Sequence, residues 1–161
     1  MDELDYVGKR VLRKDGPDKV TGRAMYTVDM ELRGMLTCGI LRSPHPHARI
    51  HNIDTSRALK LPGVKSVITA QDTPGVMHGF VETPRYPPDQ HPLAAGKVRF
   101  VGEEVAAVAA TDPYVIEEAI ELIDVDYEPL PAVFDAEEAM KQDAPEIHPT
   151  HPKVKGPFHN I

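Results

Sequence analysis

The stretch KVRFVGEEVAAVAATDPYVIEEAIELIDVDYEPLP, residues 97–131, carries the clearest structural pattern in the chain. Residues 97–102 and 103–112 are typical of two strands, the second rich in small apolar side chains. Asp112 is a suitable N-cap and Pro113 a suitable first residue for a helix over 113–122. The apolar stripe of that helix is Val115, Ile116, Ala119, Ile120 and Ile123, and its outer face is Glu117, Glu118 and Glu121. A strand over 123–131 ends at prolines, so the stretch predicts a β-β-α-β unit.

The same order of elements is expected over residues 36–68. MLTCGILRS, residues 35–43, is typical of a buried strand, and polar and apolar residues alternate over 47–51. Asp54 or Thr55 can cap a helix over 56–61 that Pro62 and Gly63 end, and VKSVITA, residues 64–70, is rich in β-branched residues. Only the order of elements repeats, because the residues of the two units differ. We therefore predict an α+β domain, with a mixed sheet built from two β-β-α-β units and helices packed on one side.

Flanking segments divide the chain. Residues 1–19 are charged and predict an extended arm, with a turn at DGPDK, residues 15–19. The domain is expected over 20–140, with a last short helix over 136–141. Residues 141–161 are rich in proline and histidine and predict a linker. The segment 73–96 contains too many prolines and glycines for a regular element, and a loop of that length is often functional or a contact surface.

Composition excludes several functions. The 161 residues suit one domain, and Cys38 is the single cysteine, so neither an intrachain disulfide nor a four-thiolate metal site can form. We find no membrane-span-like apolar run and no signal-peptide core at the N-terminus, and expect a cytoplasmic protein. Residues 103–146 hold 14 acidic side chains against one basic side chain, Lys141, which argues against nucleic-acid binding there. This acidity fits a solvated helix face or an electrostatic docking surface for a partner.

Three histidines in RSPHPHARIH, residues 42–51, raise the question of a metal site. On a strand, His45, His47, Arg49 and His51 would point the same way. Zinc needs more ligands than this row offers, and Arg49 would repel a cation. The favoured interpretation is a solvent or interface face whose histidines hydrogen-bond a partner. His148, His151 and His159 lie in the tail, where composition alone accounts for weak metal binding.

Other catalytic arrangements are not supported. Glu103 and Glu104 are adjacent on an expected strand and should point to opposite faces, so they do not form an acid–base pair. Ser43 and His45 lack an orienting acid and an oxyanion donor. Gly22 stands alone and is interpreted as a turn, and no phosphate-binding glycine loop or nucleophile elbow occurs. The residues therefore predict no catalytic, cofactor-binding or metal-binding side chain in this chain.

Three blocks of sequence resemble a known family. RKDGPDKVTGRAMYTVDM (13–30), LRSPHPHARIHNIDTSRALKLPGVKSVITAQD (41–72) and PLAAGKVRFVGEEVAAVAATD with AIELIDVDYEPLPAVFDAEEAM (92–140) are similar to the N-terminal α/β hammerhead domain of molybdenum hydroxylases. This is the xanthine dehydrogenase and aldehyde oxidase family, and the likeness is nearest to its bacterial multi-subunit members. The blocks cover nearly the whole chain in the family's order.

The resemblance implies molybdopterin, often as the cytosine dinucleotide, with molybdenum in domains that follow the hammerhead. It also implies [2Fe–2S] clusters on an iron–sulfur small subunit and usually FAD on a flavin subunit. The family's catalytic glutamate and cofactor loops match no residue of this sequence, so none is carried over.

The expected function is therefore a non-catalytic scaffold or interface domain of such an oxidoreductase, inactive as a 161-residue chain alone. The full enzyme would oxidise or hydroxylate a small aldehyde, heterocycle or aryl-CoA substrate, and the 73–96 loop would be a contact or substrate-funnel segment. Two alternatives stay open. One is an independent binding module with a His-lined metal or small-ligand site, and the other is a small enzyme that uses Glu103 or His47.

Overall fold

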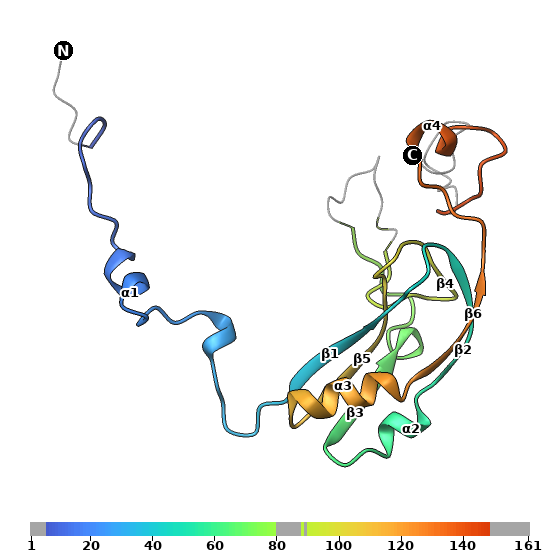
Figure 1. Cartoon of the computed structure of the whole chain (residues 1–161), viewed down its shortest axis with the longest axis horizontal. Coiled ribbons are helices and arrows are strands. Elements are labelled where there is room, and N and C mark those ends of the chain that lie inside the picture. The colour runs from blue at the N-terminus through green and yellow to red at the C-terminus, as the bar shows by residue number, and fades with distance from the viewer. Residues whose placement is uncertain (1–5, 80–87, 89, 149–161) are drawn as a thin grey trace. The chain divides into compact units, whose positions relative to one another are not determined.

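The structure is a computed structural model that describes residues 6–79, 88 and 90–148 (Figure 1). The chain divides into two compact units, Met1–Met35 and Leu36–Ile161. No helix among the described residues combines the length and apolar character that crossing a bilayer would require.

The first unit contains helix α1 (Gly16–Val20) and the 3-10 turn η1 (Thr27–Asp29). The turn predicted at DGPDK is wrong, because these residues begin a short helix. Pro17 lies in its first turn, where its fixed φ suits helical geometry. Asp15 stands at the N-cap and forms ion pairs with Arg13 at 2.7 Å and Lys19 at 2.6 Å. The side-chain hydrogen bonds from Lys19 and then Arg13 lower the pKa of Asp15.

The second unit confirms both β-β-α-β successions. The first consists of β1 (Thr37–Arg42), β2 (Ala48–Asp54), α2 (Ser56–Leu59) and β3 (Val64–Thr69), followed by η2 (Ala70–Asp72). The second consists of β4 (Lys97–Val98), β5 (Glu104–Ala110), α3 (Pro113–Glu121) and β6 (Asp124–Pro129). Helix α4 (Ala136–Ala139) comes after them.

The strands form two three-stranded sheets, β1-β5-β3 and β4-β2-β6, and every pairing is antiparallel. Each β-β-α-β unit thus places its middle strand at the centre of the other unit's sheet. The α+β class is confirmed, whereas the single mixed sheet that the sequence predicts is replaced by these interleaved sheets. Pro44 and Pro46 lie between β1 and β2 and have no amide hydrogen to donate, which disfavours a simple hairpin there.

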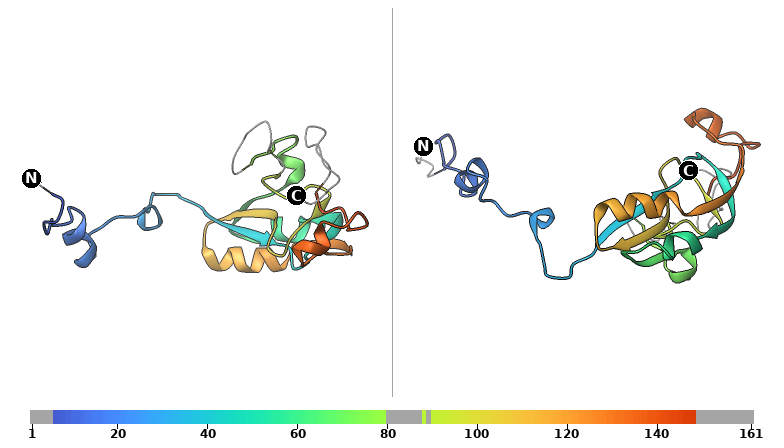
Figure 2. Two further views of the ribbon diagram at one scale, coloured as in Figure 1. Left: turned by 90° about the horizontal axis from the view of Figure 1, so that it is seen from above. Right: turned by 60° about the horizontal axis from the view of Figure 1, so that its bottom comes forward.

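Helices α2 and α3 share one core cluster with sheet β1-β5-β3, so the prediction of helices on one side holds for them (Figures 1 and 2). The fully buried members come from α2, β5 and α3 and from the residue before β6: Ala58, Ala106, Val108, Ala110, Ile116, Ala119 and Ile123. Asp112 caps α3 as predicted, because its carboxylate accepts the Tyr114 amide at 2.8 Å. A second cluster, Ala48, Ala94, Val98 and Val105, joins strands of both sheets.

Several elements are shorter than predicted, among them the helix expected over 56–61, which ends at Leu59. The strand expected over 97–102 ends at Val98, because the Arg99 amide donates to the Glu103 carboxylate and not to a neighbouring strand. The helix expected over 136–141 ends at Ala139, although Asp135 accepts the amides of Glu137 and Glu138 at 2.9 and 3.0 Å.

Candidate functional site

The histidine-rich segment between β1 and β2 begins with a buried serine. The Ser43 hydroxyl accepts the His45 amide at 3.0 Å and lies 3.0 Å from the His45 carbonyl oxygen, to which it donates. The hydroxyl is therefore used to shape the turn, and it is not a nucleophile paired with the His45 ring. That ring instead packs edge-on against Tyr127, with 4.9 Å between the ring centroids.

His47 is the most enclosed histidine of the row, with only 4% of its surface exposed. Its Nδ1 lies 2.7 Å from the carbonyl oxygen of Pro131, which can only accept, so Nδ1 carries the proton. Nε2 is then an acceptor for the Lys97 ammonium, 3.4 Å away, and Lys97 also donates to the Glu146 carbonyl at 3.0 Å. We predicted a solvent or interface face here, and for His47 that prediction is wrong, because its ring is buried against Pro131 and Lys97 of the same chain.

Lys97 is a partly buried cation beside this imidazole. Burial lowers its pKa most, and the positive charge of Arg99 adds to that effect. The hydroxyl of Tyr127, the residue that packs against His45, is also buried. Burial raises the pKa of Tyr127, and the nearby Ser43 side chain partly opposes that rise. No hydrogen bond of normal geometry reaches the Tyr127 oxygen from the described residues.

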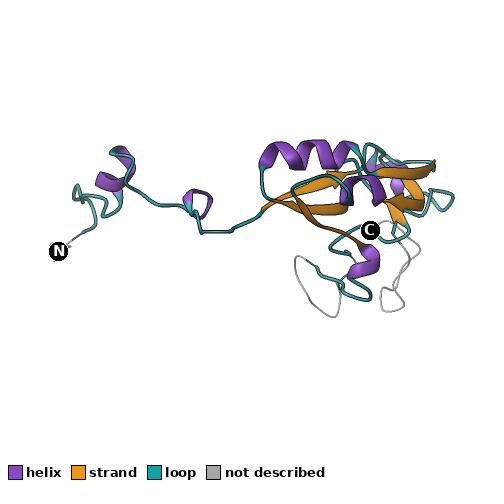
Figure 3. Cartoon of the chain, turned by 90° about the horizontal axis from the view of Figure 1, so that it is seen from below, coloured by secondary structure: helices purple, strands orange, loops and turns teal. Residues whose placement is uncertain are grey.

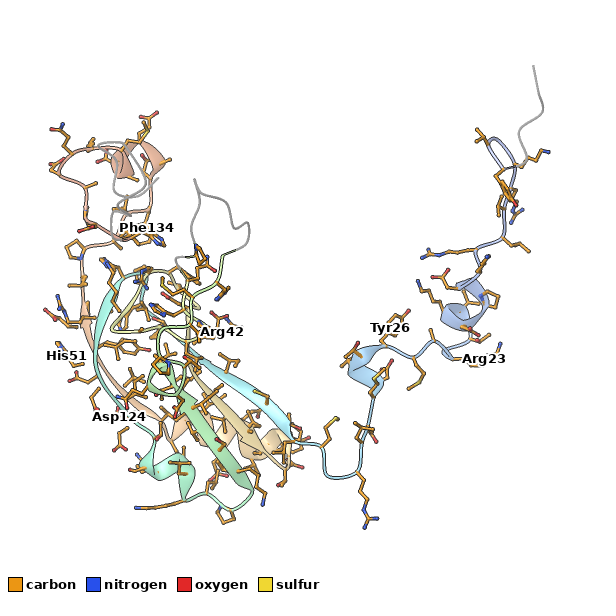
Figure 4. All side chains as sticks on the ribbon, turned by 180° about the vertical axis from the view of Figure 1, so that it is seen from behind. Arg23, Tyr26, Arg42, His51, Asp124 and Phe134 are labelled. Atoms are coloured by element: carbon orange, nitrogen blue, oxygen red, sulfur yellow. The ribbon has the colours of Figure 1, made fainter. Side chains whose placement is uncertain are left out.

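Arg49 and His51 are exposed residues of β2, and Figure 4 shows where His51 lies. Both contact the same carboxylate oxygen of Glu128 on β6, Arg49 through Nε at 3.2 Å and His51 through Nε2 at 3.0 Å. The structure thus splits the predicted row: His47 points into the protein, and Arg49 and His51 point to an acidic partner on the surface.

The split leaves no metal centre among residues 6–79, 88 and 90–148: no three His, Cys, Asp or Glu side chains there are grouped to hold an ion. The nearby cations Arg49 and Lys97 would also oppose metal binding at the histidines. His148 is half-buried, while the other tail histidines named above, His151 and His159, lie outside the described residues.

Glu103 and Glu104 form ion pairs with two different arginines, and only Glu104 lies in a strand. Glu103 is buried and pairs with the Arg99 guanidinium at 3.5 Å. Glu104 pairs with Arg42 at 2.5 Å. Partial burial of Glu104 opposes ionisation, but a backbone hydrogen bond and then Arg42 outweigh it, and the pKa of Glu104 is lowered.

A pair of clefts around Phe134 was not foreseen. Phe134, labelled in Figure 4, is 85% exposed and lines both of these clefts, which have volumes of about 430 and 290 Å³. Their walls come from the segment 132–148 alone, including Asp135, Glu138 and Lys141. The sequence signal for these clefts is Phe134 next to Asp135, the N-cap of α4. An aromatic residue beside an N-cap does not by itself indicate a binding site.

Only part of the proline-rich 73–96 segment is described. His78 and Gln90 exchange backbone hydrogen bonds of 2.8 and 3.1 Å, which close the base of the loop. Gly22 has a φ of 72°, as a glycine turn requires.

Comparison with known proteins matches residues 21–131 to the model of the "Aldehyde oxidase and xanthine dehydrogenase, a/b hammerhead domain". The gamma subunit of the 6-hydroxypseudooxynicotine dehydrogenase complex of Paenarthrobacter nicotinovorans is 41% identical, over 84% of this chain and 18% of that protein. The carbon monoxide dehydrogenase large chain of Afipia carboxidovorans is 48% identical, over 77% of this chain and 15% of that one.

Among solved structures, quinoline 2-oxidoreductase from Pseudomonas putida 86 superposes with a TM-score of 0.77 at 42% identity, over 88% of this chain and 19% of that chain. The chain thus spans less than a fifth of the length of these relatives. Sequence and fold agree over most of its length, and the chain belongs to the α/β hammerhead domain family of aldehyde oxidases and xanthine dehydrogenases.

Proposed function

We propose that the chain is the non-catalytic scaffold and interface domain of a molybdopterin-dependent hydroxylase or dehydrogenase large subunit. The enzyme would oxidise or hydroxylate a small aldehyde, heterocycle or aryl-CoA substrate. Its proposed partners are the molybdopterin-binding domains, an iron–sulfur small subunit and a flavin subunit, in the cytoplasm. We assign residues 20–140 to the domain, 1–19 to an arm and 141–161 to a linker.

The observation that carries this proposal is the exposure of the first unit. Every large apolar side chain between residues 6 and 35 is at least half exposed. These side chains are Tyr6, Val7, Val11, Leu12, Val20, Met25, Tyr26, Val28, Met30, Leu32 and Met35. Eleven exposed large apolar side chains within 30 residues indicate a surface that another protein segment covers.

The cofactors of the proposed enzyme are placed outside this domain. The buried polar residues Ser43, His47 and Glu103 are each engaged by protein groups, so none is aimed at an open site for a pterin or a cluster. We therefore assign the cofactors to other parts of the proposed enzyme: molybdopterin cytosine dinucleotide with molybdenum, the [2Fe–2S] clusters and FAD. The redox chemistry is that of these cofactors.

The test is co-production of the chain with the polypeptides encoded next to it. We expect a stoichiometric complex that contains molybdenum and iron, whereas the chain alone has no turnover. Leu12→Ser and Val20→Ser should weaken the complex, because both side chains are 85% exposed and available for contact. Lys14→Ser, an exposed polar position in the same unit, is the matched control.

The competing function is a binding module with a His-lined metal or small-ligand site. It requires the purified chain to retain one zinc ion per molecule against a mild chelator. That result, or turnover by the chain alone, would overturn the scaffold proposal.

A further inference from the structure

Sheet β1-β5-β3 has two faces, and helices α2 and α3 lie on the same one (Figure 3). That covered face includes Gly39, Val108 and Val67, which are paired across the three strands. Because side chains alternate along a strand, the neighbouring positions point to the opposite face. The register places Cys38 beside Ala109 and Ser66, and Ile40 beside Ala107 and Ile68.

These six positions form what we call the open face: Cys38, Ile40, Ser66, Ile68, Ala107 and Ala109. None of the six is charged. Cys38, Ser66 and Ile68 are exposed, and the other three are half-buried. The central strand carries alanines between Ile40 and Ile68. Because alanine side chains are short, the surface there has room for the side chains of a bound segment.

The open face continues a buried cluster of the domain. Two residues before Ala107, Val105 is fully buried together with Ala94 and Val98. Two residues after Ile40, Arg42 forms its ion pair with Glu104. The open face therefore has a buried apolar side and a charged rim, which is the anatomy of an interface core.

We propose that the open face docks an uncharged, apolar segment of the polypeptide that carries the molybdenum-binding domains. This inference rests on the proposed function. The fold occurs at a TM-score of 0.77 in quinoline 2-oxidoreductase, where the match covers only 19% of a much longer chain. Most of that chain is thus available to cover the surfaces of this domain.

The size of the face favours this occupant over a second copy. Six mostly small side chains bury far less than the roughly 800 Å² per partner typical of a stable complex. The polypeptide that carries the molybdenum-binding domains needs less area at this one face, because it would contact other surfaces of this chain as well, and each contact raises the effective concentration for the others. The lack of charge also fits a permanent contact better than a transient one.

Cys38 allows a direct measurement, because it is the only cysteine of this chain and lies exposed on the open face. The chain alone and its complex with the adjacent encoded polypeptides are labelled with N-ethylmaleimide. Trypsin then releases peptide 34–42, between Arg33 and Arg42, and mass spectrometry gives the labelling rate of Cys38. We expect the rate to fall at least about ten-fold in the complex, as for a contact that excludes reagent.

A charge variant provides a second measurement. Ala109→Glu places a carboxylate on the open face and should reduce recovery of the complex, whereas Ala136→Glu makes the same change at an exposed position of α4. The Cys38 rate in the unmodified chain stays informative if Ala109→Glu does not fold.

Each outcome decides the matter. A complex in which Cys38 labels as fast as in the free chain overturns the open-face proposal and leaves the scaffold function standing. No complex at all overturns the proposed function and this occupant with it. Protection that increases with the concentration of the chain alone assigns the face to a second copy and contradicts the proposal.

Discussion

Ile116 on α3 occupies the space that a side chain on Gly39 of β1 would need. A Cβ atom at Gly39 would lie 2.1 Å from Ile116 Cγ2, far inside van der Waals contact. The glycine is thus what lets the helix lie directly on the strand, and the face covered by α3 depends on it.

Gly39→Ala should destabilise the domain by about 1–3 kcal/mol, the usual cost of overpacking a filled core. Urea unfolding followed by circular dichroism gives the value. Gly16→Ala is the matched control, because its added Cβ would lie 3.6 Å from the nearest atom, Arg13 Cβ, in ordinary contact. Equal stability of the two variants would contradict the close approach of α3.

Asp112→Ala should lower the free energy of unfolding by about 1 kcal/mol, because it removes the acceptor for the Tyr114 amide at the start of α3. Asp112→Asn keeps an acceptor oxygen and should recover most of the loss. Thermal unfolding of the three proteins distinguishes a capping role from a charge effect: if Asn is as destabilising as Ala, the cap explanation is wrong.

His47→Ala should cost about 1–3 kcal/mol, because it leaves the Pro131 carbonyl and the Lys97 ammonium without the imidazole that joins them. His51→Ala is the comparison, and its exposed contact with Glu128 should matter by less than about 0.5 kcal/mol. Limited proteolysis should also cut segment 132–148 faster in His47→Ala. Equal behaviour of the two variants would show that His47 does not hold that segment.

The lowered pKa of Lys97 predicts a dependence of stability on alkaline pH. Between its folded-state pKa and the ordinary value of 10.5, the unfolded chain binds more protons than the folded chain. The free energy of unfolding therefore increases as pH rises through that window, because the folded chain loses the proton of Lys97 first. Below the window, Lys97 is charged in both states and the full cost of burying its charge destabilises the folded chain.

The measurement compares the chain with Lys97→Met by chemical unfolding from neutral pH to 10.5. The stability of the unmodified chain relative to the variant should increase with pH. Lys65→Met, at an exposed position of β3, should leave the slope unchanged. A difference that stays flat for Lys97→Met would mean that the ammonium is not held in a desolvated position.

Local signals in the sequence predicted the local structure well. The 3.6-residue period of the apolar stripe defined α3 to within one residue of its end, and Asp112 with Pro113 defined its start. Such signals depend on contacts within a few residues.

Features that need partners far away in the chain were not predictable in this way. His47 is buried against Pro131 and Lys97, each at least 50 residues away in the chain. A period-two pattern says that a side chain lies on one face of a strand. It does not say which face becomes buried.

The amino-acid sequence by itself determined the order of elements, the caps and the apolar faces, because these depend on backbone preferences and on the spacing of neighbouring residues. The tertiary structure alone decided that β5 lies between β1 and β3 while β2 lies between β4 and β6. This strand order is set only when the helices, the strand edges and the core side chains pack together at the same time.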